Sequence, residues 1–255
     1  AAGRPCYNLD FHTMSHDELR ALFAERSQGA DISLIEGNMG LFDSLDVEGS
    51  MSNASLATLL DTPVVLVLDV KGATRSIVPV ILGFQQFDPQ MKIGGIILNK
   101  VAGNRHEKRL REVIAHYCDI PVLGAVHRDE RLSIDERHLG LIPSNEESAA
   151  DAKLNQVADI IAEQVDLEGL QALAATASLP EVTLKPGSAP GAPELRIAYP
   201  SDAAFGFYYP GDLEALEHHG AELVPINTLN DPALPERLDG LLLGVRRDEN
   251  EARAR

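Results

Sequence analysis

Two patterns of apolar residues alternate along the chain. Apolar residues at helical spacing predict helices, and nearly continuous apolar runs predict buried strands. Residues 15–28 repeat leucines at helical spacing, and Ser15 with Glu18 three residues later has the spacing of a capping box. Residues 63–70 are instead almost continuously apolar, as in a strand buried on both faces. By the same criteria, helices are expected over 53–61, 75–87 and 106–117, and strands over 31–37, 93–101 and 120–126.

This alternation predicts an α/β fold, with a mostly parallel sheet covered by helices on both faces. Residues 146–175 are rich in alanine and are expected to form one long helical stretch. Residues 180–193 hold four prolines and two glycines in a short polar span, which indicates a linker. A strand at 195–200, a helix and strand within 210–226 and a strand within 238–244 then predict a second, partial α/β unit.

The composition and charge of the chain argue against several classes of function. A net charge of −17 argues against non-specific binding to nucleic acid or to an anionic membrane, because both need a basic surface. We therefore expect no nucleic-acid or membrane partner. No run approaches the ~18 apolar residues of a membrane helix, and no signal peptide opens the chain, so a cytoplasmic location is expected. Cys6 and Cys118 form no metal-binding or redox motif and are expected to be reduced thiols.

Polar residues close three of the expected strands: Glu36, Asp69 and Asn99. Ligands of open α/β sheets bind beyond the carboxyl ends of the strands, where hard carboxylate oxygens suit Mg²⁺. These residues therefore favour a nucleotide-like site, although each could instead cap the helix that follows. The phosphate-binding loop GxxxxGK[ST] is absent, because no lysine follows a glycine anywhere in the chain.

Several longer stretches, in this order and spacing, resemble the cobyrinic acid a,c-diamide synthase family, the glutamine-dependent amidoligases of cobalamin biosynthesis. The resemblance runs from about residue 3 to 244. The stretches are GRPCYNLDFHTM, LIEGNMGLFDS, TPVVLVLDVKG, GIILNKVAGNRHEKRLRE, IPVLGAVHRDERLSIDERHLGLIPS and RIAYPSDAAFGFYYPGDLEALEHHGAELVPINTL. Among these stretches, the RHLGLIP and DAAFGFYYP blocks are especially specific for the family.

The resemblance implies a P-loop NTPase-like synthetase domain of the dethiobiotin-synthetase and MinD-like class, followed by a class I-like glutamine amidotransferase domain. The expected division is a synthetase domain over 1–178, a linker over 179–193 and the start of the amidotransferase domain over 194–255. Such a ligase uses ATP and Mg²⁺ to phosphorylate the a and c acetate carboxylates of a corrin-type macrocycle. Ammonia from glutamine then displaces phosphate. A homodimer is compatible with this class.

The resemblance also assigns residues by position. It implies that Glu36 is a metal ligand, that Asp43 is a catalytic acid and that Asn99 recognises adenine as the cofactor-binding residue. Asn8 and Asp10 belong to a substrate-binding block. Gly37 and Gly40 are expected to let the backbone pass close to the ligand. Four further positions match the family without an assigned role: Asp69, Ser76, Arg137 and His138.

The sequence departs from the family in two blocks. A phosphate loop and a substrate loop precede the matching region in the family, and a cysteine nucleophile follows it. Neither Cys6 nor Cys118 lies in the second domain. We therefore expect these 255 residues alone to show no ATP- and glutamine-dependent amidation.

Three alternatives stay open on the sequence alone. The first is amidation of a related tetrapyrrole: hydrogenobyrinic acid, siroheme or nickel-sirohydrochlorin. The second is a MinD/ParA-like ATPase switch, which lacks a second domain of this kind. The third is a non-catalytic subunit that pairs with a separate glutaminase chain.

Overall fold

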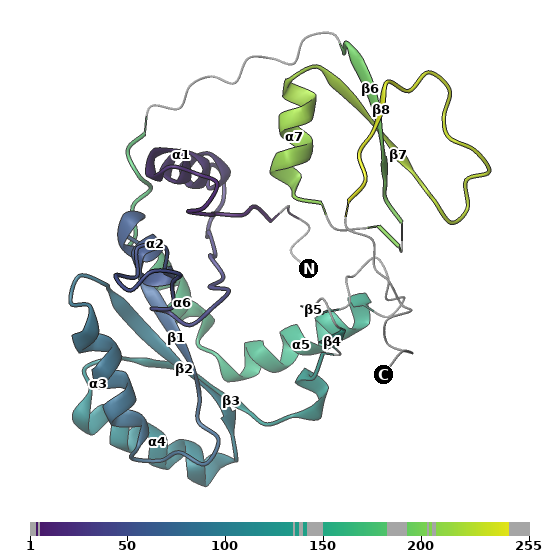
Figure 1. The fold of residues 1–255 in the computed structure, drawn as a ribbon. Coiled ribbons are helices and arrows are strands. Elements are labelled where there is room, and N and C mark those ends of the chain that lie inside the picture. The colour runs from purple at the N-terminus through teal and green to yellow at the C-terminus, as the bar shows by residue number, and fades with distance from the viewer. Residues whose placement is uncertain are drawn as a thin grey trace. The chain divides into compact units, whose positions relative to one another are not determined.

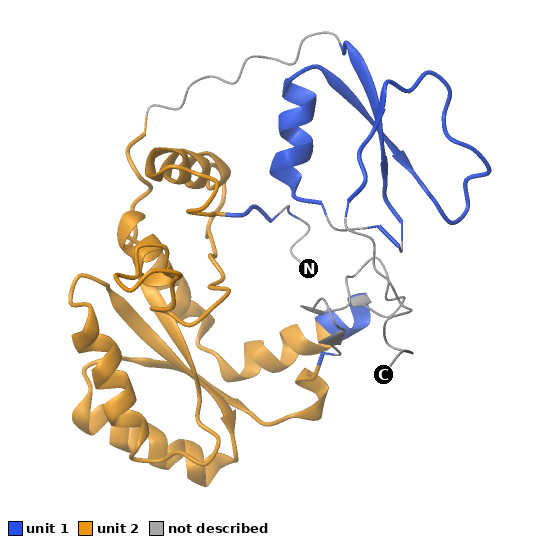
Figure 2. Ribbon diagram, in the orientation of Figure 1, with its two compact units in different colours: residues 1–8, 134–154, 185–255 blue, residues 9–133, 155–184 orange. Residues whose placement is uncertain are grey.

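The computed structural model describes residues 4, 6–134, 136–137, 140–141, 150–182, 193–202, 204–205 and 208–244. The chain divides into two compact units (Figure 2). The larger unit comprises residues 9–133 and 155–184, and the smaller unit comprises residues 1–8, 134–154 and 185–255.

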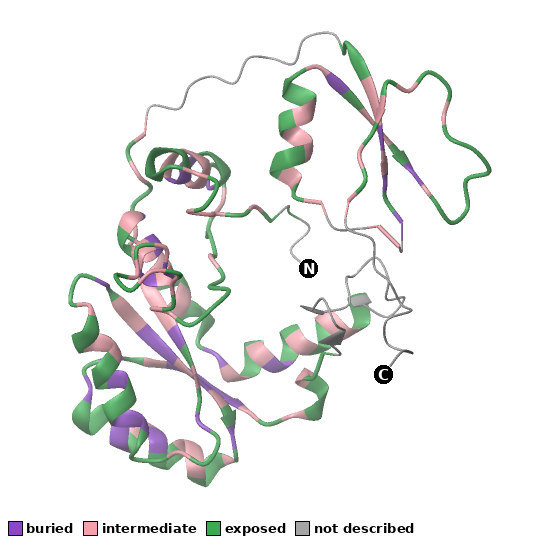
Figure 3. Ribbon diagram, in the orientation of Figure 1, coloured by how far each residue is buried: buried purple, intermediate pink, exposed green. Residues whose placement is uncertain are grey.

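The larger unit is built on three parallel strands in the order β1-β2-β3 (Figure 1). They are β1 (Val64–Asp69), β2 (Ile93–Val101) and β3 (Val122–His127). Helices α3 (Ile77–Phe87) and α4 (Asn104–Tyr117) pack against each other beside this sheet. Together they bury the main core, in which Ile81, Ile96 and Leu110 are fully inaccessible to solvent (Figure 3). The α/β class and the parallel sheet expected from the sequence are confirmed.

The apolar periodicity predicted a continuous helix over residues 75–87 although the stretch contains a proline, and α3 is continuous there. Pro79 is the third residue of the helix. The first turn has no intrahelical acceptor for its N–H groups, so a residue without an N–H is tolerated there.

Two shorter helices precede the sheet along the chain. Helix α1 (His16–Arg26) begins with the predicted capping box, in which Ser15 and Glu18 bond reciprocally. Helix α2 (Asn53–Leu59) is capped by the Ser52 hydroxyl, which accepts from Ser55 N. Leu19 of α1 and Leu60, which ends α2, are buried together in a second small apolar cluster.

The expected strand over residues 31–37 is wrong. The segment carries no ladder, and Leu34 is 93% exposed. A strand needs a neighbour for its N–H and C=O groups, and the described ladders of the sheet join β1 only to β2. Glu36 therefore lies on a loop and not at a strand end. Only Ile35 of this segment packs against the small apolar cluster.

The single helix expected over 146–175 is also wrong. The described part consists of α5 (Ala150–Gln164) and α6 (Leu167–Ala174). Between them, Val165 forms a bridge with Gly124, and Asp166 N donates to Leu123 O. Asp166 also caps α6 by accepting from Gly169 N. Pairing with β3 therefore breaks the helix, which alanine propensity alone would not predict.

The smaller unit contains a second parallel sheet in the order β7-β6-β8. Its strands are β6 (Leu195–Pro200), β7 (Ala221–Ile226) and β8 (Gly240–Leu241), and α7 (Pro210–His218) connects the first two. This confirms the expected second α/β segment. A short antiparallel pair, β4 (Glu136–Arg137) and β5 (Gly140–Leu141), completes the described strands.

Candidate functional site

The carboxyl ends of β1 and β2 bring two of the predicted polar residues together. Asp69 and Asn99 are register partners at the last paired position of the two strands. Lys100, which follows Asn99, has a left-handed φ of 61° and reaches back to the neighbouring strand, where its Nζ lies 2.8 Å from Asp69 Oδ2. The hydrogen bond from Lys100, aided by the Lys71 N–H, lowers the pKa of Asp69 below its ordinary value. Asp69 is therefore held ionised and paired.

The Asn99 side chain is partly fixed at this edge. Its Oδ1 accepts from Lys100 N at 2.9 Å. No hydrogen bond from its Nδ2 is recorded within the described part of the chain, so an amide donor can face a ligand. Recognition of a purine by this amide stays a prediction.

The loop from Glu36 to Asp43, which we call the acid loop, is held from two sides. Asn53, the first residue of α2, donates from Nδ2 to Met39 O at 3.0 Å. The next residue, Ala54, donates its N–H to Leu41 O at 2.9 Å. Helix α2 thus positions the middle of the loop, through contacts that no sequence pattern predicts.

Aromatic packing fixes the far end of the acid loop. The Phe42 ring lies 5.8 Å from the Phe84 ring and 4.7 Å from the Phe87 ring, both on α3. Leu41 packs against the main core. The neighbouring Asp43 is exposed, so the loop turns its apolar residues inward and its carboxylate outward.

The two glycines of the acid loop lie close to side chains of the same chain. A Cβ on Gly40 would overlap the Asp43 carboxylate, and a Cβ on Gly37 would lie 3.1 Å from Asn53 Nδ2. Neither glycine has a positive φ. Approach of this backbone to a ligand stays a prediction.

Glu36 fits the role of a magnesium ligand in its chemistry. The residue lies on an exposed stretch of the acid loop. Across the described residues, no three His, Cys, Asp or Glu side chains form a metal-binding group. Mg²⁺ usually takes only one or two carboxylates and completes its shell with phosphate and water, so a single exposed Glu36 suits it better than a protein cage would.

The remaining predicted residues belong to other segments of the chain. Asp10 is used locally, because its Oδ1 accepts from His12 N at 2.8 Å and its Oδ2 accepts from Thr13 Oγ1. Asn8 is exposed just before it. Ser76 precedes α3 without capping it. Arg137 is described only as a backbone position of β4, and His138 lies outside the described residues.

A charged network at the end of β3 was not predicted. Glu107 on α4 accepts from Arg111 Nε and from His127 Nε2, each at 2.8 Å. Burial opposes ionisation of Glu107, but the bonds from His127 and Arg111 outweigh it and lower its pKa. His127 N also donates to Gln164 Oε1 of α5. The Glu107–Arg111 spacing could have been found in the sequence, whereas His127 is twenty residues away.

A buried carboxylate in the smaller unit was also missed. Asp202 is only 8% exposed, and its Oδ2 accepts from both the N–H and the hydroxyl of Thr228. Its Oδ1 accepts from the N–H groups of Ala204 and Phe205. Burial alone would raise its pKa, but these four donors lower it. Asp202 thus joins the loops that follow β6 and β7.

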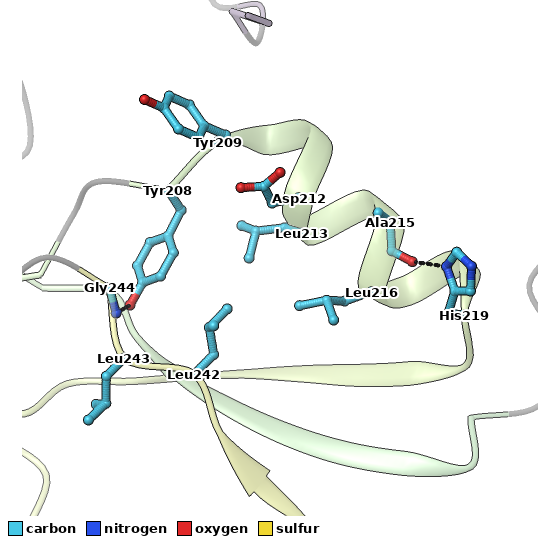
Figure 4. A pocket seen from close by; sticks show the side chains of 10 residues that line it. All are labelled: Tyr208, Tyr209, Asp212, Leu213, Ala215, Leu216, His219, Leu242, Leu243 and Gly244. Atoms are coloured by element: carbon cyan, nitrogen blue, oxygen red, sulfur yellow. Dashed lines mark hydrogen bonds between the residues drawn. The ribbon is translucent and has the colours of Figure 1, made fainter. Parts of the chain in front are cut away.

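The smaller unit also contains an apolar hollow of about 730 Å³ (Figure 4). Leu213 and Leu216 of α7 face Leu242 across it, and Tyr208 Oη accepts from Gly244 N at 3.2 Å. His219 is held at the end of α7 by the hydrogen bond from its Nδ1 to Ala215 O at 2.7 Å. The β1–β2 strand ends and the acid loop are better candidates. They are two separate places, because Phe42 packs the acid loop on the last turns of α3, which lead to the start of β2, whereas Asp69 and Asn99 lie at the carboxyl ends of the strands.

Comparison with known proteins shows which family the chain resembles. A family described as an AAA domain matches residues 11–136, which include the acid loop and both strand ends. Cobyrinate a,c-diamide synthase of Magnetococcus marinus is 46% identical over 251 residues, covering 96% of this chain and 53% of that protein. The proteins of the same name from Caldanaerobacter subterraneus and Methanosarcina acetivorans are 39% and 36% identical, covering 93% and 95% of this chain.

This chain spans about half the length of the curated relatives it matches. No solved structure matches it. Within the described residues, none of the helices is long and apolar enough to cross a membrane. The matches confirm the family resemblance seen in the sequence motifs: over almost all of its length, the chain is related to the cobyrinate a,c-diamide synthases.

Proposed function

We propose that this chain contributes the ATP- and macrocycle-binding part of an enzyme that amidates the a and c acetate carboxylates of cobyrinic acid, in cobalamin biosynthesis. The observation that carries the proposal is the 46% identity to a cobyrinate a,c-diamide synthase across 96% of this chain. The matched AAA domain supports ATP as a substrate. No comparison favours the tetrapyrrole alternatives, the ATPase switch or the non-catalytic subunit.

The chemistry requires a carboxylate to become a good electrophile. Transfer of the γ-phosphoryl group of ATP to the acetate oxygen makes phosphate the leaving group, and ammonia then displaces it to form the amide. A bound Mg²⁺ would neutralise charge on the phosphate oxygens. Glu36 would hold that ion, Asn99 would recognise the adenine, and Asp43 would act at the carboxylate being activated. Asn8 and Asp10 would contact the macrocycle.

Glutamine is proposed as the source of ammonia. Residues 194–255 would form the start of a glutamine amidotransferase domain, after a synthetase domain over 1–178 and a linker over 179–193. The parallel β7-β6-β8 sheet is compatible with this. Cys118 is buried in the core, where burial raises its pKa, so it is unsuited to be a nucleophile. The glutaminase cysteine would belong to the part of the relatives that this chain does not match. The complete protein is proposed to be a homodimer and to be located in the cytoplasm.

The complete natural protein, assayed for ATP- and glutamine-dependent amidation of cobyrinic acid, tests the proposal. Asp43→Asn is expected to lower kcat by about 100-fold or more, as loss of a general acid or base does. Glu36→Gln is expected to raise the Mg²⁺ concentration that gives half-maximal activity. Asp31→Asn is the control, because Asp31 is an exposed acid outside the acid loop.

Three results would contradict the proposal. One is a complete protein that leaves cobyrinic acid unchanged but amidates another tetrapyrrole of a panel. Another is full activity in Asp43→Asn. A third is glutamine-dependent turnover by the isolated 255 residues, which are expected to be inactive.

A further inference from the structure

The seven residues after Asp43 form a loop that is ordered by its own polar groups. In this segment, residues 44–50, which we call the Asp46 loop, the Asp46 carboxylate accepts from Ser44 Oγ at 2.8 Å and from Ser50 Oγ at 2.7 Å. It also accepts from Ser50 N at 3.0 Å. These bonds lower the pKa of Asp46, the Ser50 N–H contributing most. The loop keeps its shape without help from an apolar contact.

The end of the Asp46 loop is joined to α2. Gly49 has a left-handed φ of 77°, and its carbonyl accepts from Ser52 N at 3.1 Å. Met51 N donates to Ser44 Oγ at 3.3 Å. Ser52 caps α2. The loop is therefore a short rigid bridge between Asp43 and a helix.

This rigid loop presents two aliphatic side chains to solvent. Leu45 is 83% exposed and Val47 is 101% exposed. Leu41, a few residues earlier, packs instead against the core. Single exposed aliphatic residues are common. Here two lie on one ordered turn, within four residues of the carboxylate assigned to the chemistry, and the turn does not need them in order to fold.

We propose that the Asp46 loop is a substrate-contact element in which Leu45 and Val47 lie against the apolar ring face of the macrocycle and select among macrocycles. The inference rests on the proposed function. A carboxylated macrocycle combines an apolar ring with charged arms, and this segment carries an exposed Asp43 within four residues of two exposed aliphatic groups. The Asp46 carboxylate faces its serine donors, so its charge is satisfied within the loop. Glu48, the other acid of the loop, is exposed and without an assigned role.

The complete protein carrying Leu45→Ser and Val47→Ser together tests the inference. Cobyrinic acid binding is followed by the change in its visible absorption, without nucleotide, and KM values are measured separately for macrocycle and ATP. The Kd and KM for the macrocycle are expected to rise by about tenfold or more, because each aliphatic group loses an apolar contact. The KM for ATP and the melting temperature are expected to stay unchanged.

Two further variants sharpen the result. Leu45→Met with Val47→Ile keeps both groups aliphatic and is expected to restore macrocycle binding. Leu229→Ser with Leu234→Ser removes two comparably exposed leucines of the smaller unit, at 61% and 57% exposure, and is expected to leave macrocycle binding unchanged.

The outcomes separate the two proposals. An active wild-type protein whose macrocycle affinity is unchanged in the Leu45 and Val47 serine variant overturns the inference and leaves the proposed function standing. A wild-type protein that neither binds nor amidates cobyrinic acid overturns the proposed function first. A fall of several degrees in the melting temperature of the serine variant would mean that another part of the protein covers the loop, which also overturns the inference.

Discussion

The Asp43 carboxylate lies directly against the Gly40 backbone, so no side chain can occupy position 40 without moving that acid. The contact is reinforced by the turn in which Asp43 N donates to Gly40 O at 3.0 Å. Position 40 thus controls where the proposed catalytic carboxylate points, although Gly40 itself carries no functional group.

Gly40→Ala is therefore expected to reduce amidation by the complete protein by about 100-fold, the usual cost of moving a catalytic group by about 1 Å. The free energy of unfolding should change little, since the acid loop lies at the surface. Steady-state kinetics and thermal unfolding check both parts. Gly83→Ala on α3 is the matched control, because a Cβ there meets nothing within 4 Å. Equal activity in the two variants would show that Asp43 is not held by Gly40.

Asp202→Asn is expected to destabilise the smaller unit by about 1–3 kcal/mol, because an amide cannot accept all four hydrogen bonds and places an N–H donor against other donors. Asp212→Asn, at an exposed position of α7, is the control and should change stability by less than about 1 kcal/mol. Urea unfolding of the chain measures both. Indistinguishable midpoints would contradict a structural role for Asp202.

The pH dependence of this effect has a defined sign. The pKa of Asp202 is lowered in the folded state, so its contribution is fully present above the unfolded value of about 3.9. That contribution is lost as the pH falls through the folded pKa. The difference in stability between wild type and Asp202→Asn should therefore shrink as the solution is acidified below about pH 4. A difference that stays constant down to acid unfolding would exclude ionisation of Asp202 as its source.

Glu107→Gln is expected to cost about 1 kcal/mol, since it removes the charge that Arg111 and His127 share between α4 and β3. Glu112→Gln, on the exposed side of the same helix, should be nearly neutral. The pKa of Glu107 is lowered on folding, so its contribution is lost as the pH falls below the unfolded value of about 4.3. Urea unfolding at pH 7 and near pH 4 measures this, and an effect that grows on acidification would contradict the network.

Local sequence patterns predicted most of the elements of the larger unit. Helix α1 and β1 follow from the periodicity of their apolar residues and from the Ser15 cap, all of which act within a few residues. Residues 31–37 have the same apolar character but form no strand, because pairing depends on a neighbour that the pattern does not specify. The break at Val165 likewise depends on Gly124, 41 residues earlier in the chain.

For the candidate site residues too, some features follow from the sequence and others only from the tertiary structure. The sequence by itself determined the α/β class, the family resemblance and the choice of Glu36, Asp43 and Asn99, since residue types and their order carry that information. Only the tertiary structure decided that Lys100 pairs with Asp69, that Asn53 holds the acid loop and that four donors surround Asp202. Apart from the local bonds of Asp202 to Ala204 and Phe205, these contacts join residues 14 to 31 positions apart, and their geometry depends on packing that no local pattern encodes.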